Sequence, residues 1–301
     1  MDRLAPLFVI AAAMLWGFDG IILRPALHEL PVALVVFLES TIVTVMLTPF
    51  FKGQIKQLAA LGYKDILSFF GVAVLGGAVG TMAITKALFY VDYVNLSIPV
   101  LIQKLQPVFA IFLAAAFLKE KLPKIFFFWA GLAVLGAYLM TFGLHVPAFT
   151  PDNKTLAASG FALIAAMSFG ASTVLSKRAL ANVSFELGTY FRFLISSLIM
   201  MLIVFSSGLI YQVEMISTHQ ALIIVMIAFI IGGPAIFLYY YGLKKITASV
   251  ATICELAFPL TAVLLEYVVR GHILSLVQWA GVIVLILSII KVTNMKVPAP
   301  H

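Results

Sequence analysis

Three polar residues, Gln103, Lys104 and Gln106, interrupt an otherwise apolar run that extends from Ser97 to Leu122. Polar side chains are costly in hydrocarbon, so they usually face a protein interior or a water-filled cavity. Pro107 follows directly and removes a backbone N–H donor from the helix. This pattern is typical of a Pro-kinked membrane helix whose polar residues line a pore or a pocket.

A second stretch of the same kind begins near Ala248, with Glu255 in the place of Gln103 and Pro259 in the place of Pro107. A carboxylate inside a membrane protein can bind a cationic group or carry a proton. Glu39, which lies early in another apolar run, is a second carboxylate of this kind. We predict that Glu39 and Glu255 bind substrate and couple protons; the alternative is a structural role for both.

The polar residues of the first stretch do not all point the same way. Positions 103 and 106 share a helix face, whereas position 104 is rotated by about 100°. We therefore predict that Gln103 and Gln106 line the cavity. Lys104 would bind a substrate carboxylate or, more simply, pair with Glu39 or Glu255.

Several other side chains are candidates for substrate contact. Arg192 can bind the carboxylate of a zwitterion, although it can also extend toward lipid headgroups. Trp16 and Tyr239 offer aromatic faces that attract cations, although aromatic residues also gather at membrane interfaces. Asp19, near the middle of the first apolar run, is a secondary candidate.

The composition identifies a polytopic membrane protein. Of the 301 residues, 63% are hydrophobic and 10% are charged, whereas a soluble domain is about 25% charged. The net charge of +7 comes from residues in short gaps between apolar runs, so we predict no nucleic-acid partner. The single Cys254 excludes an internal disulfide.

A membrane-spanning helix needs roughly 20 apolar residues, and ten segments of the chain meet that need. They are approximately residues 4–24, 32–51, 66–86, 94–117, 124–143, 156–176, 186–208, 221–241, 248–269 and 273–292. The longest loop, around residues 145–154, contains Pro, Asp and Asn. We expect it to separate two halves, residues 1–147 and 155–295.

The distribution of Lys and Arg predicts the orientation. With the N-terminus in the cytoplasm, thirteen of these residues fall on the cytoplasmic side and four on the outer side, while Lys104 and Arg192 lie within helices. This bias predicts that both termini are cytoplasmic. We expect the inner membrane as the location and see no cleavable signal peptide.

Short motifs recur in the two halves in the same order. Gly76-Gly77 returns as Gly232-Gly233, and Trp129-Ala130-Gly131 returns as Trp279-Ala280-Gly281. Five helices per half is an odd number, so the second half enters the membrane from the opposite side. The fold class that we predict is therefore all-α, with ten transmembrane helices in two inverted five-helix repeats.

These features resemble the EamA family of the drug/metabolite transporter superfamily. The resemblance rests on Trp16-Gly17 in the first helix, the Pro-kinked fourth helix that ends in Lys119-Glu120-Lys121-Leu122, and the Trp-Ala-Gly fifth helix. It implies that helices 1–4 and 6–9 surround a cavity, with helices 5 and 10 outside. Arg192 matches the Arg that many members carry early in helix 7, but its counterpart in helix 2 is Glu39. The second half has Arg270-Gly271-His272 in place of the closing Glu motif.

The resemblance and the polar residues together predict a secondary transporter that works by alternating access. Its expected substrate is a small cationic or zwitterionic metabolite, such as an exported amino acid, with protons as a possible coupling ion. Two alternatives are a proton-coupled importer of a quaternary amine such as choline, with a cage of Trp16, Tyr190 and Tyr239, and a flippase for a lipid-linked precursor. The sequence has no phosphate-binding loop, no zinc motif and no nucleophile motif. We therefore expect no enzyme activity, no cofactor and no metal.

Overall fold

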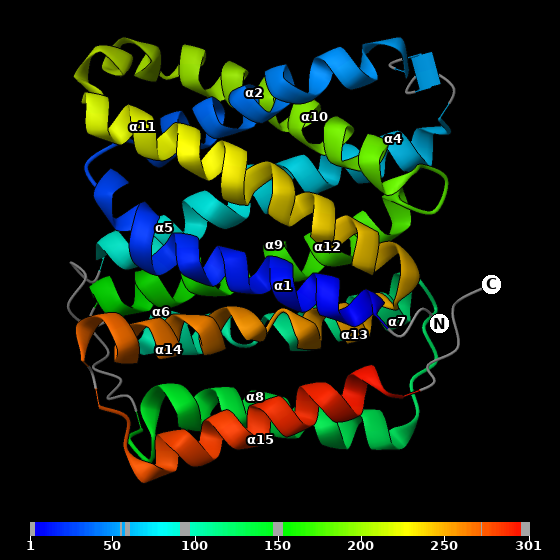
Figure 1. Cartoon of the computed structure of the whole chain (residues 1–301), viewed down its shortest axis with the longest axis vertical. Coiled ribbons are helices and arrows are strands. Elements are labelled where there is room, and N and C mark those ends of the chain that lie inside the picture. The colour runs from blue at the N-terminus through cyan, green and yellow to red at the C-terminus, as the bar shows by residue number, and fades with distance from the viewer. Residues whose placement is uncertain are drawn as a thin grey trace.

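The computed structural model describes residues 4–54, 56–57, 61–90, 97–146, 153–271 and 273–295. Within these ranges the chain is helical and contains no strand. In the described part of the chain, ten helices or helix series are long and apolar enough to cross a membrane, which confirms the predicted number. They lie side by side, across the long axis of the molecule (Figure 1).

The first half contains five of these spans, several of which consist of more than one helical segment. Its elements are α1 (Ala5–Phe18), η1 (Asp19–Leu23), η2 (Arg24–Leu27), α2 (Val32–Phe51), η3 (Lys52–Gln54), α4 (Tyr63–Val72), η4 (Ala73–Val79), α5 (Gly80–Tyr90), α6 (Ser97–Gln103), α7 (Gln106–Phe117) and α8 (Lys124–Phe142).

The second half repeats this series in inverted orientation. Its elements are α9 (Asn153–Ala179), α10 (Phe185–Ser206), η5 (Leu209–Met215), α11 (Thr218–Met226), η6 (Ile227–Gly232), α12 (Gly233–Lys245), α13 (Ala248–Cys254), α14 (Ala257–Arg270) and α15 (Leu276–Thr293).

The fourth and ninth spans are interrupted at equivalent places. α6 ends at Gln103 and α7 begins at Gln106, while α13 ends at Cys254 and α14 begins at Ala257. A proline follows each break within a few residues, where it removes a backbone donor from the helix. The sequence predicted a kink at each of these prolines, and the structure has a break in the helix just before each one.

The third and eighth spans share a different irregularity. Both contain a π-helical segment, η4 and η6, and each of these segments includes or adjoins a Gly-Gly pair. π-helical turns are rare and are frequent at functional sites. A third π-helical segment, η1, begins at Asp19 in the first span.

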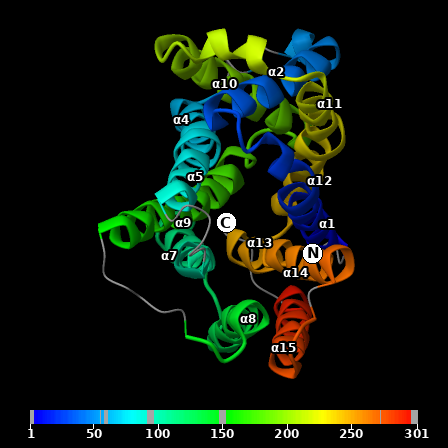
Figure 2. The ribbon, with the colours of Figure 1, turned by 90° about the vertical axis from the view of Figure 1, so that its left-hand side faces the viewer.

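The fifth and tenth spans form a pair of their own. α8 and α15 pack against each other, and Gly136 brings their backbones together, because a Cβ atom there would lie 2.8 Å from the backbone nitrogen of Leu285. Figure 2 shows this pair beside the group formed by the other helices. The separate position of helices 5 and 10 that the family resemblance implied is therefore present.

The beginning of α1 and the end of α15 lie on the same side of the molecule (Figure 1), as an even number of spans requires. We call this side the termini face. It also holds the connection between α7 and α8 and the connection between α12 and α13. The other side, which we call the opposite face, holds the connections from η2 to α2 and from α14 to α15.

Candidate functional site

A cavity of about 280 Å³ lies among η2, α2, η4, α5 and α10. Two guanidinium groups, one carboxylate and several small polar residues form its wall. The lining residues are Arg24, Val36, Glu39, Ser40, Gly76, Gly77, Thr81, Arg192, Phe193 and Ser196. Glu39 and Arg192 lie early in α2 and α10, which begin at opposite faces, and both line the same cavity.

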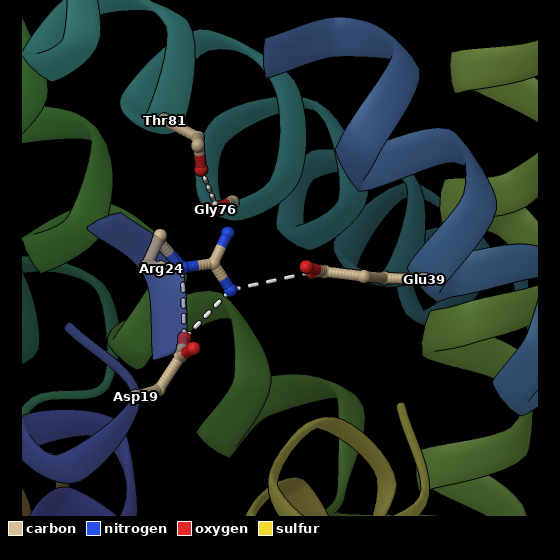
Figure 3. A network of polar contacts seen from close by, with 5 residues as sticks. All are labelled: Asp19, Arg24, Glu39, Gly76 and Thr81. Carbon is tan, nitrogen blue, oxygen red and sulfur yellow. Dashed lines mark hydrogen bonds and ion pairs between the residues drawn. The ribbon is translucent and has the colours of Figure 1, made fainter. Parts of the chain in front are cut away.

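Arg24 joins two carboxylates at one side of the cavity. Its Nε donates to Asp19 Oδ2 at 2.8 Å, and its Nη2 lies 2.6 Å from the same oxygen. Nη2 also donates to Glu39 Oε2 at 3.3 Å. Figure 3 shows Arg24 between the two acids, with Gly76 and Thr81 nearby. The pairing holds the Glu39 carboxylate in the cavity wall.

This group of charges is incompletely paired. The second oxygens, Asp19 Oδ1 and Glu39 Oε1, are buried, and no described residue donates a hydrogen bond to either. A buried oxygen without a donor is unfavourable. Formally, two carboxylates and one guanidinium leave one negative charge, and a second guanidinium, that of Arg192, lines the same cavity.

Arg192 lines the cavity and also contacts Tyr240, which does not line it. Its Nη1 donates to the Tyr240 hydroxyl at 3.3 Å, and that hydroxyl lies 3.2 Å from Ser176 Oγ. The guanidinium also lies over the Tyr240 ring, 5.7 Å from its centroid. Arg192 thus turns into the protein, and the alternative that it extends to the headgroups is wrong.

A second polar cluster surrounds Glu255 at the break between α13 and α14. Gln106 Nε2 donates to Glu255 Oε2 at 2.8 Å, and Tyr239 OH and Thr173 Oγ1 donate to Oε1 at 2.7 and 3.1 Å. All three donors are uncharged. Gln106 stands at the other interrupted helix, so this contact joins the two breaks across the repeats.

The aromatic rings of Trp16 and Tyr239 pack against each other, with centroids 5.3 Å apart. Tyr190 lies elsewhere: its ring stacks on Phe51 at 5.7 Å, and its hydroxyl is 3.3 Å from Thr48 Oγ1. The predicted cage of three aromatic rings is therefore not formed. Without it the structure gives no support to a quaternary-amine site at this place.

The remaining residues of the first interrupted helix differ from expectation. Lys104 is 9% exposed, but the predicted ion pair with Glu39 or Glu255 is wrong, because Glu39 pairs with Arg24 and Glu255 is held by uncharged donors. Gln103 and Gln106 share no part of the 280 Å³ cavity. Gln106 contacts Glu255 instead.

Sequence reasoning missed Arg24. The distribution of Lys and Arg assigns Arg24 to the four residues on the outer side. In the structure the chain remains helical through η2 and turns the guanidinium inward. The available signal was Asp19 five residues earlier, a carboxylate that needs a partner in a membrane helix. Thr173 and Ser196 gave no comparable signal, because hydroxyl residues are common in such helices.

In the described ranges, no three residues among His, Cys, Asp and Glu are grouped in a way that would bind a metal ion.

Comparisons with known proteins agree with this architecture. The pattern of the EamA-like transporter family matches residues 3–142 and 156–294. The chain is 45% identical over 293 residues to the riboflavin transporter ImpX of Fusobacterium nucleatum subsp. nucleatum, an alignment that covers 96% of this chain and 97% of the relative. A solved crystal structure superposes with a TM-score of 0.74 over 96% of each chain at 16% identity, a likeness of fold alone. The chain belongs to the EamA-like transporter family.

Proposed function

We propose that this transporter carries riboflavin, or a closely related flavin, across the membrane. The observation that carries the proposal is the full-length identity of 45% with a protein named as a riboflavin transporter. At that identity over nearly the whole of both chains, the helices that line the cavity are expected to correspond.

The chemistry of the cavity supports a flavin. Riboflavin is uncharged at neutral pH, and its ring system presents carbonyl oxygens and ring nitrogens as acceptors beside one imide N–H. Arg24 and Arg192 supply donors, and Glu39 supplies an acceptor for an N–H group. Glu39 is already paired with Arg24, so the cavity suits an acceptor-rich neutral ring better than a free cation.

The size of the cavity is also compatible. About 280 Å³ is close to the lower end of the roughly 300–1,000 Å³ that ligand pockets usually occupy. We expect the ring system to occupy the cavity and the ribityl chain to extend beside it. Phe193 and Val36 then offer apolar contact to the ring.

The proposed mechanism is alternating access. Two inverted repeats with interrupted fourth and ninth spans give two related ways of opening the central region, one toward each face. The cavity contains residues of both repeats, Glu39 of the first and Arg192 of the second. Relative movement of the repeats would therefore change its walls.

We further propose that protons couple to transport at Glu255. This carboxylate lies within the bundle and receives hydrogen bonds from Gln106, Thr173 and Tyr239. Loss or gain of its charge would change a contact that joins the two repeats. Arg192, which borders the substrate cavity and contacts Tyr240, lies between this cluster and the substrate.

A zwitterionic amino acid is the second candidate substrate. The observation in its favour is that opposite charges, Glu39 and Arg192, line one cavity. An α-amino group and an α-carboxylate would bind to these two groups respectively. The distribution of Lys and Arg supports a cytoplasmic location for the termini face in either case.

Uptake into proteoliposomes separates these possibilities. Purified full-length protein is reconstituted, and uptake of labelled riboflavin is measured beside protein-free liposomes, with and without a pH gradient. We expect saturable riboflavin uptake that unlabelled flavins inhibit and that a mixture of amino acids or choline leaves unchanged. Uptake of an amino acid with no uptake of riboflavin would replace the proposal with the second candidate.

A further inference from the structure

Glu120 makes a contact between the two repeats at the termini face. It lies in the connection between α7 and α8 and is 5% exposed. Its Oε1 accepts a hydrogen bond from the backbone N–H of Ala248 at 2.7 Å. Its Oε2 accepts from the backbone N–H and the hydroxyl of Ser249, at 3.1 and 2.6 Å. A carboxylate of the first repeat therefore holds the first residues of α13 in the second repeat.

The packing near this contact is apolar and tight. Ala114 of α7, Val174 of α9 and Ala248 of α13 form a small buried cluster, in which Val174 is 3% exposed. α7 and α13 are the termini-face portions of the two interrupted spans, and they pack on each other. Glu120 and this cluster together close the termini-face end between the repeats.

At the corresponding turn of the opposite face one backbone feature recurs, and the sequence that follows it differs. Lys119 and Gly271 occupy equivalent positions, and both have positive φ, 54° and 65°. The residue that follows is Glu120 in the first repeat and His272 in the second. His272 itself lies outside the described residues.

One of the residues that Glu120 binds has a counterpart in the first repeat. Ser249 near the start of α13 corresponds to Ser97 at the start of α6. The second repeat thus offers no carboxylate in the position from which Glu120 acts.

A carboxylate at the first turn of a helix ordinarily stabilises that helix alone. Here the bonded residues are 128 and 129 positions apart in the chain and belong to different repeats. Hydrogen bonds to a charged, buried acceptor are stronger than neutral ones. Separation of α7 from α13 would leave this carboxylate without its three donors, so the contact resists opening.

We infer that Glu120 is the gate residue of the termini-face end, which must release α13 before the cavity can open to that side. The inference rests on the alternating-access mechanism proposed above. Because the opposite end has no equivalent carboxylate, the resting protein favours the state in which the termini-face end is shut. Loss of the Glu120 carboxylate shifts the population toward the state open at the termini face.

Two cysteine reporters test this gate in the full-length protein. The native Cys254 is first replaced by Ala. One reporter is then Val174→Cys, beneath the gate, and the other is Ser196→Cys, in the cavity wall. Each is combined with Glu120→Gln in reconstituted membranes, and labelling by a membrane-impermeant thiol reagent is measured from each face separately.

We expect Glu120→Gln to raise labelling of Val174→Cys from the termini face by roughly tenfold and to lower labelling of Ser196→Cys from the opposite face. Glu186→Gln removes a charge at the start of α10 on the same face. This control should leave the labelling of both cysteine reporters unchanged. Ser249→Ala removes one of the three donors and should change the labelling of both reporters in the same direction but by less. It replaces Glu120→Gln in the test if that variant does not fold.

Two results would overturn the inference: both reporters becoming more reactive, which indicates general loosening, or neither changing. The test needs no substrate. If the unmodified protein carries no riboflavin but the reporters shift as expected, the proposed substrate fails and the gate stands. If riboflavin is carried and the reporters do not shift, the gate fails and the substrate stands.

Discussion

The carboxylates of Glu39 and Glu255 occupy two polar clusters whose chemistry differs. Glu39 borders the cavity, forms an ion pair with Arg24 and keeps a second oxygen to which no described residue donates. Glu255 borders none of that cavity and is held by three uncharged donors. In the first cluster one carboxylate oxygen of Glu39 remains available to a ligand. In the second cluster, donors of the protein itself form hydrogen bonds to both carboxylate oxygens of Glu255.

The difference shows that an inverted repeat can preserve a fold while exchanging the chemistry of equivalent positions. Glu39 corresponds to Arg192, and Gln103 corresponds to Glu255. The first repeat has an acid at position 39 where the second has a base at position 192, and both residues line one cavity. In our proposal the Glu39 cluster binds the flavin and the Glu255 cluster responds to protons, with Arg192 between them.

The largest effect is expected at Arg24. Arg24→Ala leaves Asp19 and Glu39 as neighbouring buried carboxylates without a counter-charge. Breaking a fully buried pair costs roughly 3–5 kcal/mol; because Arg24 is 39% exposed, we expect a loss of unfolding free energy on the order of 2 kcal/mol and little riboflavin uptake. Thermal unfolding in detergent measures the first quantity.

A combined variant sharpens this prediction. Asp19→Asn and Glu39→Gln added to Arg24→Ala remove the uncompensated charges, so the midpoint of thermal unfolding should recover while riboflavin uptake does not. A midpoint that is unchanged in Arg24→Ala alone would show that the ion pairs contribute nothing measurable.

Glu255→Gln comes next and separates the clusters by function. We expect the variant to fold and to exchange riboflavin across the membrane at equal pH, because the cavity is intact. Uptake driven by a pH gradient should fall by about tenfold or more, since the group that carries the proton is gone. Gradient-driven uptake equal to that of the unmodified protein would assign proton coupling to another group.

Arg192→Lys should have a smaller, selective effect. Lysine keeps the charge but loses the planar set of donors, so we expect the KM for riboflavin to rise by roughly three- to tenfold with the maximal rate little changed. Initial rates over a range of riboflavin concentrations measure both. An unchanged KM would remove Arg192 from the substrate site.

The smallest effect is expected from Tyr239→Phe, which removes one of the three donors to Glu255 and leaves the ring beside Trp16. The apparent pH dependence of gradient-driven uptake should shift, while the KM for riboflavin at saturating gradient stays the same. A changed KM with unchanged pH dependence would place Tyr239 at the substrate and not at the proton site.

The sequence predicted the fold well because the signals of the fold are local. Apolar length determines the spans, and Pro107 and Pro259 mark the breaks that the structure contains. The repeated glycine pairs coincide with the π-helical segments η4 and η6. The repeated Trp-Ala-Gly motif was less informative, since Gly281 contacts α8 closely whereas Gly131 has open space where a Cβ would lie.

The site was harder to predict because its contacts join distant parts of the chain. Glu39 and Arg192 were singled out and do share a cavity, but Arg24 looked like a loop charge and Lys104 looked like the partner of an acid. In the sequence, Glu120 belongs to the charged group Lys119-Glu120-Lys121 that ends an apolar run. Its hydrogen-bond partners lie 128 and 129 residues away. Polarity shows that a residue needs a partner in the membrane; it does not show which partner the packing supplies.

The central claim is that the flavin binds in the cavity that Glu39 and Arg192 border, and protection from alkylation tests it most directly. In the Cys254→Ala background, Ser196→Cys places a thiol in the wall of that cavity. Riboflavin should protect this thiol with a half-maximal concentration close to its KM for transport, and choline should not protect it. Full alkylation at saturating riboflavin, in a variant that still transports riboflavin, would contradict the account.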